Sequence, residues 1–181
     1  ICAPAGALRR EEEIAEFKQI LGEMGYRVKV GPNCLKKYGY FAGTDEERAS
    51  DFMGFVEDPE IKAIFFLRGG WGCARLIPYL DFDKISQNPK IIMGFSDVTT
   101  LLNAILVRSQ LVTFHGPSGN SSWNAYSRSY LKRVLSEGEN VVFKNAPEDS
   151  EIITYASGNA SGTLWGGNLT VICSLIGTEF L

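Results

Sequence analysis

A serine between a strand-like run and a helical pattern is the strongest candidate for chemistry in this sequence. The apolar run 91–95 leads directly into Ser96 and Asp97, and a helix is expected from Val98 to about residue 108. A serine in such a sharp turn exposes its hydroxyl, and the free amides of the following helix can stabilise an oxyanion. Val98 stands where the usual G-x-S-x-G pattern has its second glycine. The alternative interpretation is that Ser96 or Asp97 only caps the helix.

A glycine-rich loop is the second candidate. Arg68-Gly69-Gly70-Trp71-Gly72 follows the short apolar run 61–67. Glycines at a strand end let the backbone approach a ligand and present amides to it, as in half of an oxyanion hole. The loop lacks the Lys-Ser/Thr of a P-loop and the G-x-G-x-x-G of a dinucleotide site. A tight turn without a function in binding is the alternative.

The only histidine, His115, ends the apolar run 111–114. A serine nucleophile needs a base, usually a histidine, so a Ser96–His115 dyad is one interpretation. The other interpretation is a structural histidine that anchors the Gly116-Pro117 turn by a hydrogen bond.

The elements that must position these residues follow an alternating pattern. Helical spacing predicts helices over 11–24 and over a stretch that begins after the cap Thr44 and includes Phe52. The short apolar runs predict buried strands, and residues 26–30 predict a further short strand. This alternation predicts βαβ crossovers and a mostly parallel sheet covered by helices. The loops after Leu67, Phe95 and Phe114 would then share one rim of the sheet.

The pattern changes after residue 138. Residues 141–143 and 152–155 are expected to form edge or linker strands. We expect an N-terminal nucleophile domain over 1–145, an interdomain linker over 146–162 and the start of a C-terminal domain over 163–181. A domain that begins at 163 has too few residues here to close its own core, so we expect the chain to be part of a longer protein.

Composition narrows the possible partners. The chain has 181 residues, a net charge of −3 and no basic run that would neutralise phosphates, so no nucleic-acid partner is expected. No apolar run reaches the ~18 residues of a membrane span. The four cysteines show no C-x-x-C spacing, so we expect free thiols in a reducing cytoplasm and neither a metal nor a cofactor. A homodimer is compatible with the sequence, which contains no pattern that determines the oligomeric state.

Several stretches together resemble one family, the serine LD-carboxypeptidases and the related microcin-immunity peptidases. They occur in the family's order and span essentially the whole chain, so the ordered set is more specific than any single piece. The pieces are Ala3-Pro4-Ala5-Gly6, Phe41-Ala42-Gly43-Thr44-Asp45-Glu46-Glu47-Arg48, Arg68-Gly69-Gly70-Trp71-Gly72 with Arg75-Leu76, Leu80-Asp81, Asn88-Pro89-Lys90, Gly94-Phe95-Ser96-Asp97 with Thr99, Phe114-His115-Gly116-Pro117, and Gly166-Gly167-Asn168-Leu169.

The resemblance implies a flavodoxin-like α/β domain, with a mostly parallel sheet and helices on both faces, followed by the truncated start of a second, strand-rich domain. It also implies that Ser96 is the nucleophile and that the backbone amides of Gly70 and Asp97 form the oxyanion hole.

The resemblance also bears on the rest of the site. Gly69, Trp71 and His115 are expected to contact the substrate. The family's catalytic glutamate and histidine lie in the C-terminal domain and would follow Leu181. His115 matches the family's His-Gly-Pro turn and not its base, which favours the structural interpretation of this histidine.

The function that the resemblance implies is that of a cytoplasmic serine carboxypeptidase in peptidoglycan recycling. It would release terminal D-alanine from murein tetrapeptide by cutting an L,D-peptide bond through an acyl-enzyme on Ser96. One alternative is a microcin-immunity-type peptidase that cleaves an aminoacyl or peptidyl nucleotide, with Trp71 as a stacking surface for the base. The other is a non-catalytic α/β module whose glycine loops bind an anion or another ligand.

Overall fold

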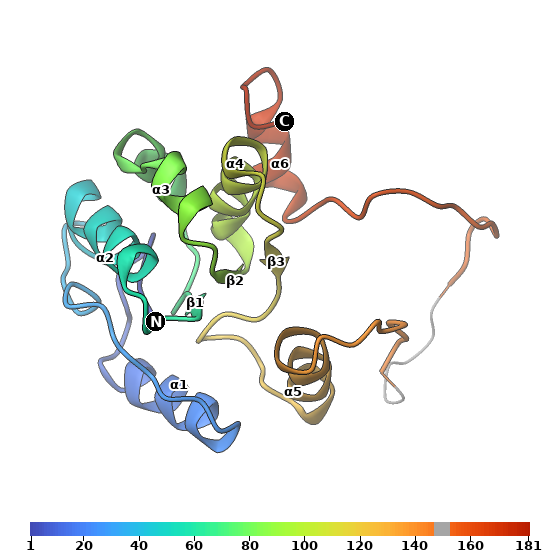
Figure 1. Cartoon of the computed structure of the whole chain (residues 1–181), viewed down its shortest axis with the longest axis horizontal. Helices are drawn as coiled ribbons and strands as arrows, with labels where there is room; N and C mark the ends of the chain where they lie inside the picture. The colour runs from blue at the N-terminus through green and yellow to red at the C-terminus, as the bar shows by residue number, and fades with distance from the viewer. Residues whose placement is uncertain (147–152) are drawn as a thin grey trace. The chain divides into compact units, whose positions relative to one another are not determined.

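A parallel sheet of three strands is the centre of the computed structural model, which describes residues 1–146 and 153–181. The strands β1 (Ala63–Phe65), β2 (Ile91–Gly94) and β3 (Phe114–His115) are neighbours in this order (Figure 1). Phe65 pairs with Met93, and Gly94 pairs with His115. The strands expected from the apolar runs 61–67 and 91–95 are confirmed, and the third lies at Phe114–His115, later than the expected 111–114. Their carboxyl ends face the same rim because both pairings are parallel.

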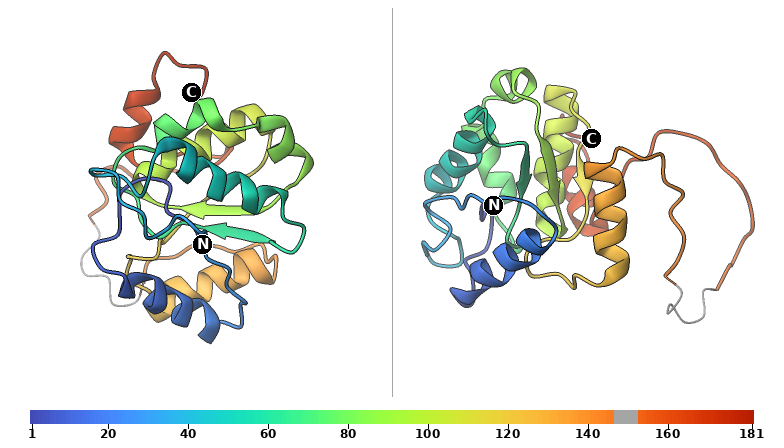
Figure 2. Two further views of the ribbon diagram at one scale, coloured as in Figure 1. Left: turned by 90° about the vertical axis from the view of Figure 1, so that its left-hand side faces the viewer. Right: turned by 60° about the horizontal axis from the view of Figure 1, so that its bottom comes forward.

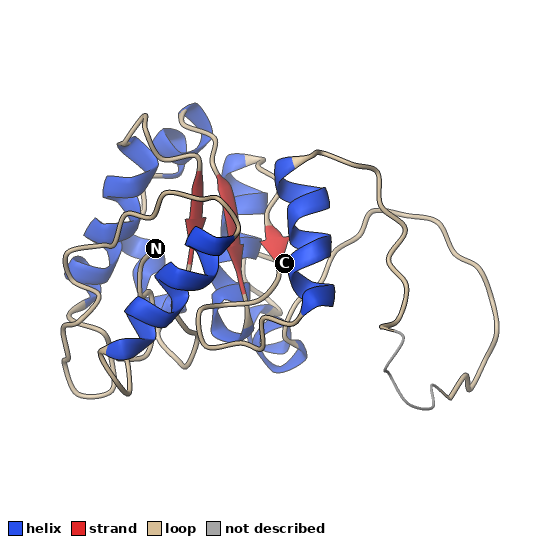
Figure 3. Ribbon diagram, turned by 90° about the horizontal axis from the view of Figure 1, so that it is seen from below, coloured by secondary structure: helices blue, strands red, loops and turns tan. Residues whose placement is uncertain are grey.

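Helices cover both faces of this sheet. The helical elements around the sheet are, in chain order, α1 (Glu12–Glu23), α2 (Asp45–Glu57), the 3-10 helix Cys73–Tyr79, α3 (Phe82–Gln87), the 3-10 turn Ser96–Val98 and α4 (Thr99–Ser109). Figure 2 shows α1 on one side of the strands and α2, α3 and α4 on the other. The crossovers from β1 to β2 and from β2 to β3 run in the same direction, which places α3 and α4 on one face. Figure 3 shows the strands enclosed between these helices, so the predicted fold class is confirmed.

Alternation at the end of β1 explains how each face is packed. Successive strand residues point to opposite faces. The ring of Phe65 packs edge-on against Phe17 of α1, with centroids 6.5 Å apart, and the ring of Phe66 stacks on Phe52 of α2 at 6.1 Å. Phe17, Phe52 and Phe66 are fully buried. These phenylalanines therefore join the strand that precedes the glycine loop to helices on both sides.

The contacts divide the chain into two compact units. The first unit comprises Ile1–Ser122 and Gly166–Leu181, and the second comprises Trp123–Trp165. The second unit contains α5 (Ala125–Leu131), which continues into a π-helical turn (Lys132–Ser136). The linker expected over 146–162 includes residues 147–152, which lie outside the described residues, so the expected domain boundaries stay a prediction.

The end of the first unit is joined to α4. Helix α6 (Leu169–Leu175) is capped by Asn168, whose side-chain oxygen accepts a hydrogen bond from Val171 N. The backbone amide of Asn168 donates to Thr99 Oγ1 over 3.0 Å. Gly167 has φ of 149°, and a Cβ there would lie 2.4 Å from Thr99 Cγ2. Gly167 and Asn168 thus pack directly on the first turn of α4.

Two of the expected strands are wrong. Residues 26–30 form no strand: Ile1 N donates to Lys29 O, Gly31 N donates to Ile1 O, and Tyr26 N donates back to Leu21 O near the end of α1. Residues 141–143 form none either, and Val142 O accepts a hydrogen bond from the hydroxyl of Tyr130 instead of from a neighbouring strand.

For the strand expected over 152–155, residue 152 lies outside the described residues, and 153–155 form no strand. Within residues 1–146 and 153–181, no helix has the length and apolar character needed to cross a bilayer.

Candidate active site

Ser96 lies in a strained turn between β2 and α4. Its φ is 63°, a left-handed backbone angle that a residue other than glycine rarely adopts. Two residues earlier, a Cβ on Gly94 would lie 2.4 Å from Val98 Cγ1 and 2.8 Å from Phe66 Cδ2. The turn is therefore tight enough to require a glycine at 94. Both features are those of a nucleophile elbow, in which a strained backbone presents the serine hydroxyl outward.

The capping interpretation of this serine finds no support in the geometry. Neither the 3-10 turn Ser96–Val98 nor α4 has a side-chain cap at its N-terminus. The Asp97 carboxylate accepts a hydrogen bond from Cys73 N over 2.8 Å, so it bonds outside its own helix. Ser96 is half-buried, and Asp97 is buried. The turn is thus shaped by packing and by a distant partner, not by a local cap.

The glycine loop packs against this elbow. A Cβ on Gly69 would lie 3.0 Å from Ser96 Cβ and 3.2 Å from Asp97 N, which is closer than side chains normally pack. Gly70 has φ of 122°, and Gly72 has φ of 132°. The loop after β1 and the turn after β2 therefore meet at one rim, as expected from the parallel strands. The assignment of Gly70 and Asp97 amides to an oxyanion hole stays a prediction.

The loop is also fixed from the side of the chain start. Gly6 N donates to Gly69 O over 3.2 Å, and a Cβ on Gly70 would lie 2.7 Å from the hydroxyl of Tyr40. Arg68 Nη1 donates to Ala7 O over 2.9 Å. The close approach of the Tyr40 hydroxyl to Gly70 brings a polar aromatic group to the rim, which the sequence analysis did not identify.

His115 lies on the same rim but is not paired with Ser96. Its ring packs against Phe95, with centroids 5.3 Å apart and planes tilted by 34°. Desolvation lowers the pKa of His115 from its usual value. Among the described residues no hydrogen bond joins His115 to Ser96, and the following turn is held by the backbone bond from Gly116 N to Gly94 O. The Ser96–His115 dyad is therefore not formed in this structure.

Trp71 presents an exposed ring beside the glycine loop. It is 59% exposed, and its ring lies 5.7 Å from that of Phe41, with the planes tilted by 35°. The guanidinium of Arg75 lies over the Phe41 ring, 5.3 Å from the ring centroid. The indole therefore packs on the Phe41 ring and keeps an exposed surface, and its expected contact with the substrate stays a prediction.

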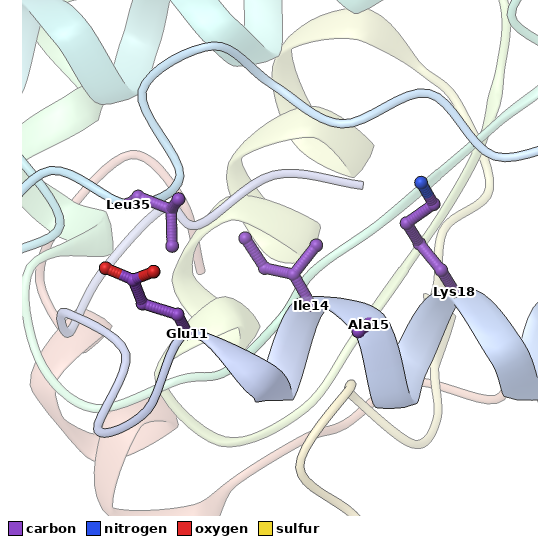
Figure 4. A pocket seen from close by; sticks show the side chains of 5 residues that line it. All are labelled: Glu11, Ile14, Ala15, Lys18 and Leu35. Carbon is purple, nitrogen blue, oxygen red and sulfur yellow. The ribbon is translucent and has the colours of Figure 1, made fainter.

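A pocket of about 380 Å³ lies elsewhere in the first unit (Figure 4). It is formed by one side of α1 and by the loop that carries Leu35, and Figure 4 shows Ile14 and Leu35 pointing toward each other across it. Glu11 and Lys18 supply its charged groups. None of its lining residues belongs to the elbow, the glycine loop or the His115 turn, so this pocket is not the candidate site.

Sequence reasoning missed one buried cation at the site. Arg48 of α2 is 1% exposed; it forms an ion pair with Asp45 and donates to Gly72 O over 3.2 Å. Its other partner is the carbonyl of Pro4. Because Arg48 follows three acidic residues in a helical stretch, its local pattern is that of a solvated helix face. No local signal distinguishes it from an exposed arginine.

Comparison with known proteins agrees with this geometry. Residues 1–116 match the LD-carboxypeptidase N-terminal domain family. The probable murein peptide carboxypeptidase of Bacillus subtilis is 37% identical over 88% of this chain and 51% of its own length. The murein tetrapeptide carboxypeptidase of Pseudomonas aeruginosa is 34% identical over 98% of this chain and 60% of its own. The chain thus spans between half and two thirds of the length of these relatives.

Solved structures lead to the same family. The muramoyltetrapeptide carboxypeptidase of Oxalobacter formigenes superposes with a TM-score of 0.80 at 28% identity, covering 99% of this chain and 60% of that one. The microcin C7 self-immunity protein MccF superposes with a TM-score of 0.86 at 26% identity, covering 99% of this chain and 63% of that one. The family match covers more than half of the chain. The chain therefore belongs to the LD-carboxypeptidase family.

Proposed function

We propose that this chain is the nucleophile-bearing part of a serine LD-carboxypeptidase that acts in the cytoplasm during peptidoglycan recycling. Its substrate would be murein tetrapeptide, from which it releases the terminal D-alanine. The observation that carries the proposal is the backbone of Ser96, held at φ of 63° with the glycine loop in contact with it. Such strain persists only where the surrounding structure enforces it, and it is typical of functional sites.

The proposed reaction begins with attack of Ser96 Oγ on the carbonyl carbon of the scissile bond. The oxyanion that forms accepts hydrogen bonds from the amides of Gly70 and Asp97. The C–N bond then breaks, D-alanine leaves with a proton on its nitrogen, and the acyl group stays on Ser96. Water hydrolyses this ester and regenerates the hydroxyl.

The proton of Ser96 needs an acceptor that the described residues do not place beside it. His115 packs against Phe95 and forms no hydrogen bond with Ser96 in the described part of the chain. As the resemblance implies, we assign the base to a histidine oriented by a glutamate in the part of the protein that would follow Leu181. His115, Gly69 and Trp71 then contact the substrate at the rim.

A peptidase of the microcin-immunity kind is the second candidate. The TM-score of 0.86 with MccF exceeds the 0.80 with the muramoyltetrapeptide carboxypeptidase, and the exposed indole of Trp71 offers a stacking surface. Sequence identity favours murein peptides, because the two murein carboxypeptidases are 37% and 34% identical to this chain, whereas MccF of Escherichia coli is 29% identical.

The test is D-alanine release from murein tetrapeptide by the full-length natural protein. We expect Ser96→Ala to lower kcat by at least about 10⁴-fold, because the nucleophile is lost. Ser50→Ala is the matched control, since Ser50 is exposed on α2 and should leave turnover unchanged. Normal turnover of Ser96→Ala would disprove the assignment. A panel with an aminoacyl sulfamoyl nucleotide separates the two peptidases, and a serine that never reacts with a phosphonate would favour a binding module.

A further inference from the structure

The peptide group between Gly72 and Cys73 is bound at both ends by buried charged side chains. Its carbonyl accepts a hydrogen bond from Arg48 Nη1 over 3.2 Å, and its N–H donates to Asp97 Oδ2 over 2.8 Å. Arg48 is 1% exposed, and Asp97 is 6% exposed. The cation faces the negative end of the peptide dipole and the anion faces the positive end, so both contacts are charge-assisted. We call this arrangement of Arg48 and Asp97 the charge clamp.

The cation of the clamp is itself fixed in place. Arg48 is paired with Asp45 and donates to the carbonyl of Pro4. In the described part of the chain its Nε has no hydrogen-bond partner. Burying a guanidinium with one donor unsatisfied costs free energy that a surface arginine would not incur. This cost falls on a side chain that bonds to the carbonyl of Gly72 in the loop, which is consistent with a role in shaping the loop.

The glycine loop needs such external support. Gly70 and Gly72 have φ of 122° and 132°, which glycine adopts without strain. The same freedom makes other backbone orientations equally accessible, so the loop does not determine its own conformation. The proposed role of Gly70 requires its amide to face the oxyanion, and rotation of the peptide groups of the loop would change the direction of that amide. Preorganised amides stabilise an oxyanion only when their direction is set before the reaction begins.

We propose that Asp97 and Arg48 are positioning residues, which hold the loop 69–72 in the conformation that directs the Gly70 amide to the oxyanion. Asp97 thus has two separate roles, one through its amide in the oxyanion hole and one through its carboxylate. The proposal rests on the proposed function of Ser96, because it concerns the same oxyanion. It links α2, the glycine loop and the elbow through one peptide group.

The test measures kcat and KM for D-alanine release by the full-length natural protein, with active sites counted by phosphonate labelling. Asp97→Ala removes the acceptor of the Cys73 amide, so we expect kcat to fall about 100-fold, as for one lost oxyanion donor, and KM to change less than about threefold. Asp97→Asn keeps an oxygen acceptor, and we expect it to retain at least about a tenth of the wild-type kcat.

The matched control is Asp51→Asn. Asp51 is a buried carboxylate of α2 that accepts from Asn33 and has no contact with the glycine loop in the described structure. We expect it to lower stability and leave kcat per active site unchanged. Wild-type kcat in Asp97→Ala, or an Asp97→Asn variant as slow as Asp97→Ala, would overturn the clamp.

Hydrogen exchange at the Cys73 amide gives a readout that does not depend on catalysis. We expect slow exchange in the wild type and in Asp97→Asn, and exchange at least about tenfold faster in Asp97→Ala. If Ser96→Ala is inactive while Asp97→Ala turns over normally, the clamp fails and the proposed function stands. If Ser96→Ala turns over normally, the proposed function fails, and unchanged Cys73 exchange in Asp97→Ala would overturn the clamp as well.

Discussion

The two compact units of this chain differ in how their apolar side chains are used. In the first unit, the helix behind the elbow buries Leu101 and Ile105 completely. In the second unit, Tyr155 is 94% exposed and Leu164 is 95% exposed. The rim that carries Ser96 is therefore backed by a packed core, whereas the backbone of 153–165 is held by few apolar contacts of its own. A strained backbone such as that of Ser96 persists only where a packed core enforces it.

We expect the largest difference between the units when one leucine in each is truncated to alanine and the free energy of unfolding is compared. Leu101→Ala removes a fully buried side chain from α4, and we expect it to lower the free energy of unfolding by about 2–5 kcal/mol. Leu164→Ala should change it by about 0.5 kcal/mol or less, because the side chain is exposed. Urea unfolding of the 181-residue chain measures both. Equal losses would remove the distinction between the units.

A methyl group at the elbow should have the next largest effect. Gly94→Ala would bring a Cβ to 2.4 Å from Val98 Cγ1, and we expect it to cost about 1–3 kcal/mol. The control is Gly54→Ala in the exposed middle of α2, where a Cβ meets no atom within 4 Å. That variant should stabilise the chain by about 0.5–1 kcal/mol, because alanine favours the helix. A neutral Gly94→Ala would show that the turn is not tight.

We expect the smallest change in the free energy of unfolding for the Asp45 carboxylate, whose contribution depends on pH. The hydrogen bond from Arg75 holds the pKa of Asp45 below its usual value of 3.8. A lowered carboxyl pKa adds stability that is fully present above the unfolded-state value and is lost as the pH falls through the folded-state value. We expect Asp45→Asn to cost on the order of 1 kcal/mol at pH 7, and the gap to the wild type to begin to shrink below about pH 4 and to close as the pH falls through the folded-state pKa.

The second unit contains an exposed ion pair that can be compared with the ion pair of Asp45 in the same pH series. Arg133 and Glu139 form a salt bridge with side chains that are 38% and 43% exposed. Glu139→Gln should therefore change the free energy of unfolding very little at any pH. A gap for Asp45→Asn that stayed constant down to pH 2 would show that Asp45 does not titrate in the folded chain as described.

Local patterns predicted the strands and helices next to Ser96 well. Buried strands and amphipathic helices are defined by the spacing of neighbouring residues, which a single sequence displays. The strand expected over 26–30 failed because its backbone bonds join it to Ile1 and to the end of α1 and not to a neighbouring strand, and the existence of a partner strand is not a local property. The same limit explains why 141–143 looked strand-like and instead bonds to a tyrosine hydroxyl.

The sequence allowed us to predict which loops meet at the rim of the candidate site, but not the hydrogen bonds that hold those loops together. Parallel strands bring their carboxyl ends together, so the neighbourhood of Gly69 and Ser96 followed from topology. The charge clamp joins residues that are 24 positions apart on each side of the peptide group. No spacing rule connects such residues, and nothing in the local sequence separates the buried Arg48 from a surface arginine.

The contact between Thr99 and Asn168 has a consequence for whatever chain follows. Thr99 lies three positions after Ser96, and the bond to the Asn168 amide ties the polypeptide there after the whole excursion of the second unit. Arg108 and Glu179 add an ion pair near the last residue. The end of the first unit is thus attached to α4 at two points, to Thr99 close to the nucleophile and to Arg108 at the other end of the helix. For a side chain that reaches Ser96 from a later part of the protein, the effective concentration would depend on its distance along the chain from the anchored Asn168, and not on the long path from residue 123.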